Sequence, residues 1–204
     1  METIKVRITF QEKILGTSPA NEDIYRDFIG SKAPDASTVE DEVEALGVDA
    51  VVEKGMTVFP KDENGSPLLW DYQVKGFFKD ACAMLQRAAK AGGGGVGKES
   101  AKLKAYKKII DGLIFPSPRQ IVLHSPSGIG VCQRPLRAQT AQGERVALAM
   151  SEELPAGTWC DVEIALLSAE YIPAVFEWLD YGALRGIGQW RNSGCGRFTY
   201  EVTD

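Results

Sequence analysis

The sequence is poor in the residues that build metal cages and disulfide frameworks. It has one histidine, His124, and its four cysteines lie far apart with no Cys-x-x-Cys pair. A structural zinc site takes four closely spaced ligands, and a disulfide scaffold needs a denser set of cysteines. We therefore expect no metal and no other cofactor, and we expect buried or free thiols. The cysteines are Cys82, Cys132, Cys160 and Cys195.

Long apolar runs are missing as well. No stretch approaches the roughly 20 apolar residues that a membrane-spanning helix needs. The opening METIKVRITF alternates as a strand does and lacks the apolar segment of a secretion signal. We expect a cytoplasmic protein without a membrane partner. Its 204 residues, 44% of them hydrophobic and 25% charged, fit one globular domain with a substantial core.

Positive charge is scarce overall but unevenly distributed. The net charge is −5, and residues 1–53 alone hold 12 acidic and 5 basic side chains, a balance of −7. The remainder therefore carries +2, and residues 87–108 hold seven basic side chains against Glu99 alone. Lysine and arginine dominate the affinity for phosphates, so we place any anion site in the later part of the chain. The alternative for 87–108 is a solvated helix face.

Hydrophobic periodicity predicts an α+β fold. Alternation of period 2 predicts a first strand at Lys5–Phe10 and a last strand at Arg197–Val202. Helical spacing predicts helices over 72–91, 100–113 and 172–184. Short apolar runs predict hairpins between 56–59 and 68–70 and between 120–124 and 130–134, and further strands at 146–151 and 158–167.

Two segments do not fit this pattern. The acidic stretch 17–53 lacks period 2 and is predicted to be an excursion from the sheet. Residues 92–97 contain five glycines, whose ordering cost is high, so we expect a flexible tip there.

A glycine-rich segment between the last helix and the last strand carries the strongest chemical signal. From Arg185 to Arg197 it holds two Gly-x-Gly pairs and three arginines. Glycines let backbone N–H groups approach a phosphate, and arginine forks add bidentate contacts. A dinucleotide-binding loop is excluded, because it follows a strand and opens a helix. The alternative is a tight connection that needs glycine only for turning.

The stretch Gly186–Phe198, GIGQWRNSGCGRF, resembles the C-terminal glycine loop of the RAMP superfamily, the RNA-binding subunits of CRISPR effector complexes. Three further stretches are similar to family motifs and follow in the family's order: Val6–Phe10 with Gly16, Val74–Leu85, and the ELPAGTWC hairpin motif at 153–160. The second of these lacks the family's proline and serines, and its spacing from glycine to lysine is one residue shorter.

The resemblance implies a ferredoxin-like (RRM-like) antiparallel sheet with helices on one face. In that topology the strand at Lys5–Phe10 lies beside the strand at Arg197–Val202 within one sheet. It implies a single domain over 1–204, with insertions at about 17–70 and 87–145. It also implies that the chain grips the backbone of a single-stranded nucleic acid, which in this family is RNA, within an assembly of other subunits or copies of itself. The residues themselves leave RNA and DNA open. The predicted binding residues are Arg185, Gly186, Gly188, Trp190, Arg191, Gly194, Gly196, Arg197, Lys75 and Lys79. Trp190 is a candidate for stacking on a base, and a core position is its alternative.

We predict no catalytic residue. Some family members cut RNA with a histidine near the first helix, which is absent here, or with an aspartate after the first strand. His124 lies mid-chain in an apolar run, and Asp23, Asp27 and Asp35 stand among many other acids. Two alternatives stay open: a protein-docking inhibitor or assembly factor with the same fold, and a metal-independent or aspartate-dependent RNase. The sequence also leaves open a CRISPR system, a phage or another source.

Overall fold

The computed structural model describes residues 1–20, 56–92, 94–140 and 143–203, which fall into two compact units. Unit 1 comprises Met1–Ile14, Pro60–Gly128 and Leu154–Asp204, and unit 2 comprises Leu15–Phe59 and Ile129–Glu153. Most of the acidic stretch 17–53, predicted to be an excursion, lies outside the described residues. The single domain with two insertions stays a prediction.

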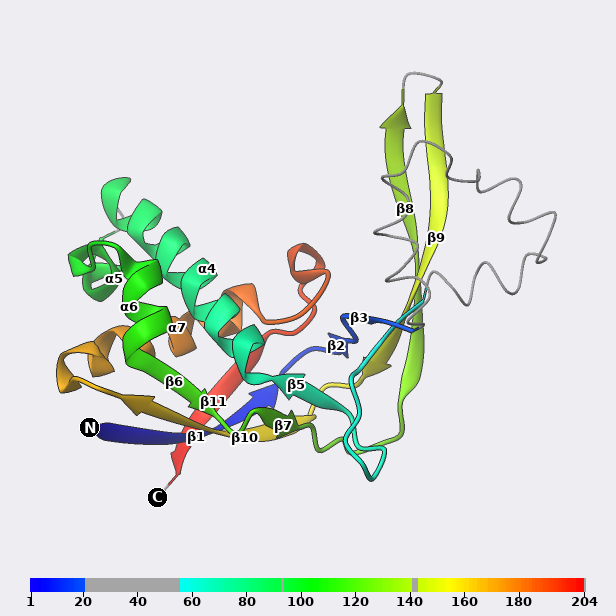
Figure 1. Ribbon diagram of the computed structural model, residues 1–204. Helices are drawn as coiled ribbons and strands as arrows, with labels where there is room; N and C mark the ends of the chain where they lie inside the picture. The colour runs from blue at the N-terminus through cyan, green and yellow to red at the C-terminus, as the bar shows by residue number, and fades with distance from the viewer. Residues whose placement is uncertain (21–55, 93, 141–142, 204) are drawn as a thin grey trace, which may run out of the picture. The chain divides into compact units, whose positions relative to one another are not determined.

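Unit 1 is built on a four-stranded antiparallel sheet (Figure 1). Its strands are β1 (Glu2–Phe10), β6 (Ile114–Ser117), β10 (Trp159–Leu166) and β11 (Phe198–Thr203), in the order β11-β1-β10-β6. The side chains of Val6 and Ile8 are buried on one face of β1, as the alternation requires. The predicted pairing of the first and last strands is confirmed, with Val6 opposite Val202.

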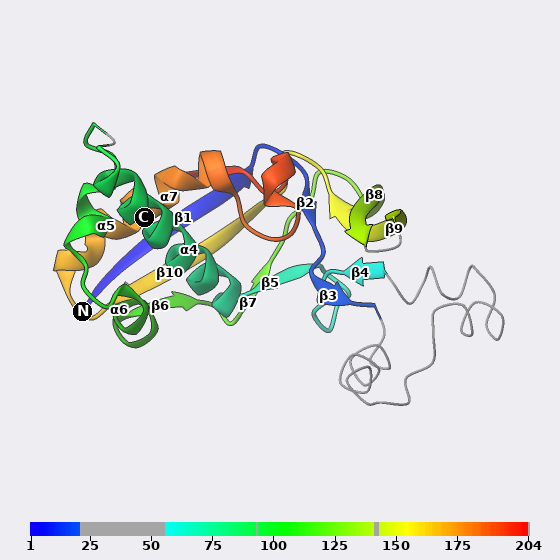
Figure 2. The same cartoon turned by 90° about the horizontal axis from the view of Figure 1, so that it is seen from above.

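Four helices of the described chain cover one face of this sheet (Figures 1 and 2). They are α4 (Asp71–Lys90), α5 (Lys98–Lys102), α6 (Tyr106–Leu113) and α7 (Ile172–Arg185). The ring of Phe78 on α4 lies 5.4 Å from that of Trp178 on α7, and both side chains are fully buried. The helices predicted over 72–91 and 172–184 are confirmed, because their apolar faces supply this core.

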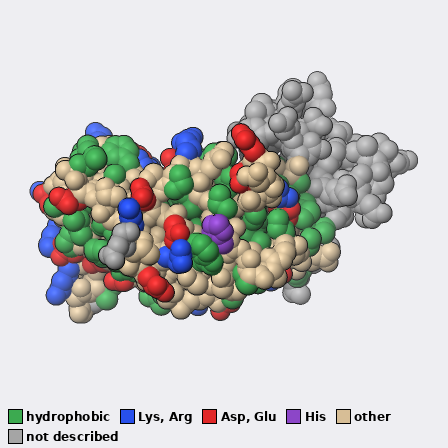
Figure 3. All heavy atoms as spheres, turned by 90° about the horizontal axis from the view of Figure 1, so that it is seen from below, with side chains coloured by type: hydrophobic (Ala, Val, Ile, Leu, Met, Phe, Trp, Pro, Cys, Tyr) green, Lys and Arg blue, Asp and Glu red, His purple; other side chains and the backbone are tan. Residues whose placement is uncertain are grey.

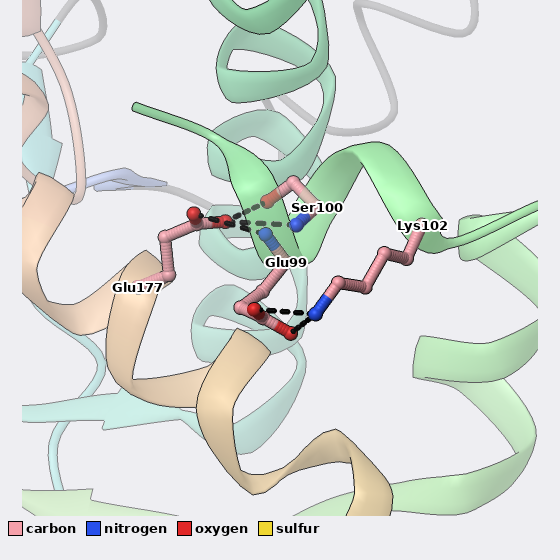
Figure 4. A network of polar contacts seen from close by, with 4 residues as sticks. All are labelled: Glu99, Ser100, Lys102 and Glu177. Atoms are coloured by element: carbon pink, nitrogen blue, oxygen red, sulfur yellow. Dashed lines mark hydrogen bonds and ion pairs between the residues drawn. The ribbon is translucent and has the colours of Figure 1, made fainter. Parts of the chain in front are cut away.

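The single helix predicted over 100–113 is wrong, since two helices occupy the range. Ala105 has a φ of 52°, a left-handed conformation that no helix can continue through. The first of the two helices is held by the Glu177 carboxylate, which accepts the Ser100 N–H at 2.8 Å and the Ser100 hydroxyl at 2.6 Å (Figure 4). The buried indole N–H of Trp178 donates to the same hydroxyl at 3.0 Å.

Both predicted hairpins are wrong. In unit 1, β5 (Leu68–Trp70) pairs with β7 (Gln120–Val122), two strands that the sequence assigned to different hairpins. In unit 2, β4 (Met56–Val58) pairs with β3 (Ser18–Pro19) and, in parallel, with β9 (Gly143–Leu154). Short apolar runs indicate a strand but carry no information about its partner.

The remaining strands of unit 2 are β2 (Ile14–Leu15), which adjoins β9, and β8 (Gly130–Thr140), which forms a long antiparallel hairpin with β9. The segment 153–160, which the resemblance predicted as a hairpin, joins β9 and β10, which belong to different sheets. The turn at Gly157 instead donates its N–H to the Phe10 carbonyl at 2.8 Å.

All four cysteines are buried free thiols, as expected. Among the described helices, none combines the length and the apolar character needed to cross a bilayer.

Candidate nucleic-acid interface

The predicted glycine loop joins α7 to β11 in unit 1 and contains one short 3-10 turn, η2 (Arg191–Ser193). Its four predicted glycines, at 186, 188, 194 and 196, all have positive φ values between 73° and 92°. Trp190 also has a positive φ, of 54°, which is rare for a side chain of its size. Glycine is therefore favoured at these four positions, because it adopts a positive φ without steric cost.

Two of the glycines close the base of the loop. A Cβ on Gly186 would lie 2.6 Å from the carbonyl carbon of Gly196, and a Cβ on Gly196 would overlap the carbonyl oxygen of Ile187. Ile187 donates its N–H to the Gly196 carbonyl at 2.9 Å, and Gly196 donates to Lys13 at 2.8 Å. These two positions therefore fit the alternative interpretation, a tight connection that needs glycine for its backbone. Neighbouring backbone occupies the space that a side chain would need.

Two arginines of the loop converge on one acid of α4. Arg185 Nε lies 2.9 Å and Arg191 Nη1 lies 2.7 Å from the same oxygen, Oδ2 of Asp80. Arg185 Nη1 also donates to the side-chain oxygen of Asn192 at 2.8 Å. The α4 helix thus fixes both guanidinium groups in place.

Asp80 is charged in this arrangement. Partial burial raises the pKa of its carboxyl, but the hydrogen bond from Arg185 and the positive charge of Arg191 outweigh burial, so its pKa falls below the ordinary value. Asp80 is not among the residues predicted from the sequence, whereas its neighbour Lys79 is. The available signal was that α4 contains only two acids, Asp71 and Asp80, and that one of them falls in its middle.

Arg197 stands apart from this pair. Its Nε is buried and has no hydrogen-bond partner among the described residues. An added Cβ at Gly194 would lie 3.7 Å from its guanidinium carbon, an ordinary contact distance, so Gly194 and the Arg197 side chain are neighbours. The side chain of Trp190 on the same loop is 38% exposed. The three arginines of the loop carry three positive charges and Asp80 carries one negative charge, so a positive charge remains in surplus here.

The two predicted lysines point elsewhere. Lys79 Nζ lies 2.6 Å from the Asp111 carboxylate on α6. Lys75 Nζ donates to the Asp111 carbonyl at 3.1 Å and lies 4.5 Å from the centre of the Phe115 ring. The structure ties both lysines to the α6 side of α4 and ties the arginines to Asp80. The ten predicted residues therefore fall into two groups.

The basic segment 87–108 contributes a third positive region. Lys102 is paired with Glu99 at 2.6 Å. Lys104, Lys107 and Lys108 line a hollow of about 570 Å³ where α5 and α6 meet. This segment is thus partly neutralised and partly available to an anion.

The residues weighed for catalysis do not come together among the described residues. Asp23, Asp27 and Asp35 lie outside the described part of the chain. His124 is exposed on unit 1 and stacks on Trp159. Within the described ranges, no group of three His, Cys, Asp or Glu side chains could hold a metal ion.

No protein-family model and no curated protein sequence matches this chain. Its fold is similar to that of solved structures. One is a chain of the type III-B Cmr-beta complex bound to cognate target RNA, with a TM-score of 0.52 and 10% identity, and the match covers 99% of this chain. This chain spans 58% of the length of that one. Another is a chain of a type IV-B CRISPR complex, with a TM-score of 0.50, 14% identity, and 99% and 90% of the two chains covered. At these identities the likeness is one of fold, and it agrees with the resemblance in sequence: the structural neighbours are subunits of CRISPR complexes of the RAMP type.

Proposed function

We propose that this chain is a non-catalytic subunit of a ribonucleoprotein assembly that holds single-stranded RNA by its phosphates, through the loop Arg185–Arg197. One observation carries the proposal. Two arginines of the loop are fixed on a single carboxylate, while Arg197 has a buried Nε without a partner among the described residues. Phosphate oxygens are acceptors for the guanidinium N–H groups of these arginines that remain available, and their negative charge would be balanced by the surplus positive charge.

The ion pairs with Asp80 prepare the arginines for binding. A guanidinium has five N–H donors, and the hydrogen bonds of Arg185 and Arg191 to Asp80 and Asn192 use only part of them. A side chain that is already ordered loses less entropy when it meets a phosphate. Asp80 therefore lowers the net positive charge around the loop, but it also holds the side chains of Arg185 and Arg191 in an ordered position.

The order of the sheet supports the ferredoxin-like arrangement that the resemblance implies. The order is β11-β1-β10-β6, all pairs are antiparallel, and α4 and α7 follow β1 and β10 along the chain. This succession of strand, helix, two strands, helix and strand is the one expected of that fold. The glycine loop then falls between the second helix and the fourth strand.

RNA is favoured over DNA by the neighbour of the same fold that is described as bound to a cognate target RNA. The other partners follow from the same comparison, since both neighbours are chains of multi-subunit complexes. We include further subunits, or copies of this chain, as partners in the proposal.

The test is a binding titration by fluorescence anisotropy with labelled single-stranded RNA and DNA at several salt concentrations. We expect binding at low salt that weakens as salt rises, because each phosphate contact releases counterions. If neither the single-stranded RNA nor the single-stranded DNA binds at low salt, the proposal is refuted. Binding to a partner protein without nucleic acid would then favour the docking alternative.

A further inference from the structure

The helix-free face of the unit 1 sheet carries a hollow of about 600 Å³. It is lined from β1, β10 and the segment from β6 through β7, and His124 stands at its edge. Figure 3 shows this face, where the single histidine lies exposed with acidic and basic side chains around it. No residue of the glycine loop contributes to this hollow.

Three side chains form a column beside the hollow. The Arg7 guanidinium carbon lies 3.9 Å from the centre of the Trp159 ring. The His124 ring lies 4.1 Å from a Trp159 ring at an interplanar angle of 21°, which is a stacked arrangement. The exposed imidazole is therefore the end of an ordered stack.

The backbone and one ion pair hold this column rigidly. The backbones of His124 and Trp159 exchange N–H···O bonds of 2.8 and 2.9 Å, which hold the two residues side by side. Arg7 donates to both oxygens of Asp161 at 2.8 and 2.9 Å. A flat ligand would find the platform already formed.

The charges on this face argue against a phosphate as the ligand. Arg7 is matched by Asp161, and Lys5 is matched by Glu163 at 3.7 Å. Gln120 and Ser117, two uncharged polar residues, also line the hollow and suit the hydrogen-bonding edge of an uncharged ring. The Ser117 hydroxyl donates to the Glu163 carbonyl at 3.4 Å and can still accept a hydrogen bond. An aromatic platform beside neutral polar groups is the chemistry that accepts a base.

We infer that this hollow is a nucleobase-binding site in which a base stacks on the outer face of His124. This site adds to the proposed function and does not depend on it, because the base needs no phosphate contact. A single strand whose phosphates are held by the glycine loop would gain a second contact at this hollow, made by stacking of a base and not by charge.

The experiment uses the only histidine as its own reporter. We would record the imidazole carbon-bound proton resonance of the full chain by NMR during titration with adenosine, a nucleoside without phosphate. A stacked purine should move this resonance upfield through its ring current, with little dependence on salt. The variant with Arg191→Ala and Arg197→Ala should show the same shift, which separates this site from the glycine loop.

Two variants then test the stack in a titration with a short single-stranded oligonucleotide. His124→Ala should weaken binding about 10-fold, and His124→Phe should restore most of the affinity, because a phenyl ring keeps the stacking face. Both variants keep the backbone bonds to Trp159, and a thermal melt checks their fold. An imidazole resonance that stays unmoved at saturating adenosine overturns the inference, as does unchanged oligonucleotide binding by His124→Ala. A hollow that takes a side chain of a partner protein would give this negative result.

Discussion

Gly186 and Gly196 lie so close together that a Cβ on the first would stand 2.6 Å from the carbonyl carbon of the second. The two glycines are ten residues apart in sequence and form the base of the arginine-bearing loop. Any side chain at either position must push the two backbone segments apart. The loop can present its arginines only while this contact persists.

We predict that Gly186→Ala lowers the free energy of unfolding by at least about 2 kcal/mol, because it adds strain at a φ of 73° to the overlap with Gly196. Urea unfolding measures the change. The matched control is Gly76→Ala on α4, where an added Cβ meets nothing within 4 Å. That variant should be neutral or stabilised by up to about 1 kcal/mol, since alanine is the better helix former.

The double variant Arg191→Ala and Arg197→Ala should bind single-stranded RNA at least about 10-fold more weakly than the wild type. The loss should be uniform across sequences, because phosphate contacts position a strand without reading it. The slope of log affinity against log salt should fall by roughly one to two. The titration is repeated with Arg119→Ala, an exposed arginine paired with Asp71, which should bind as the wild type does.

Asp80→Asn should destabilise the protein by about 1–2 kcal/mol at neutral pH, because the two arginines lose their charged acceptor. The folded-state pKa of Asp80 lies below its unfolded value of about 3.9, so its stabilisation is complete above about pH 5. That stabilisation is lost as the pH falls through the folded-state pKa. Urea unfolding of both proteins at a series of pH values should show the difference narrowing on acidification. A constant difference would mean that the carboxylate charge does not hold the loop.

Ser100→Ala should cost about 1–3 kcal/mol, because it leaves the buried indole N–H of Trp178 without an acceptor. It also removes the hydroxyl that donates to Glu177. Thermal denaturation compares this variant with Ser127→Ala on an exposed turn, which should melt as the wild type does.

The four thiols should react with a thiol reagent only after unfolding. Burial raises the pKa of Cys160 to about 12 and that of Cys82 to about 11, so almost no thiolate of these two exists at pH 8. Cys132 and Cys195 are buried and so out of reach of the reagent. We expect slow or no reaction in buffer and four equivalents in denaturant, measured by absorbance. Rapid reaction of one thiol in the folded protein would locate a region that opens easily.

Much of unit 1 could be predicted from the sequence because its signals are local. The alternation in β1 and the apolar faces of α4 and α7 each lie within one element, and the resemblance added the pairing of β1 with β11. The partners of β4, β5 and β7 could not be predicted, since several short apolar runs fit one another equally well. The break at Ala105 was also missed, because the helical period continues across a residue whose backbone is left-handed.

The candidate site likewise has a part that could be predicted from the sequence and a part that could not. Glycine and arginine identify the loop by composition, and its position between helix and strand follows from the fold. The role of Asp80 depends on which face of α4 meets the loop, and that is a tertiary fact. The column of Arg7, Trp159 and His124 draws on three segments that are distant in sequence, so no pattern along the chain indicates it.

The position of β1 at the centre of its sheet has a consequence for biosynthesis. Thr9 pairs with Trp159 on one side and with Thr199 on the other, so this strand emerges from the ribosome long before either partner is translated. Its apolar face has no sheet to join during that interval. The sheet can close only after β10 and β11 have been translated, and closing it pairs strands that are distant in sequence, which is slow. The apolar face of β1 therefore stays uncovered until both partner strands have been translated, and chaperones that shield apolar segments would protect it during that interval.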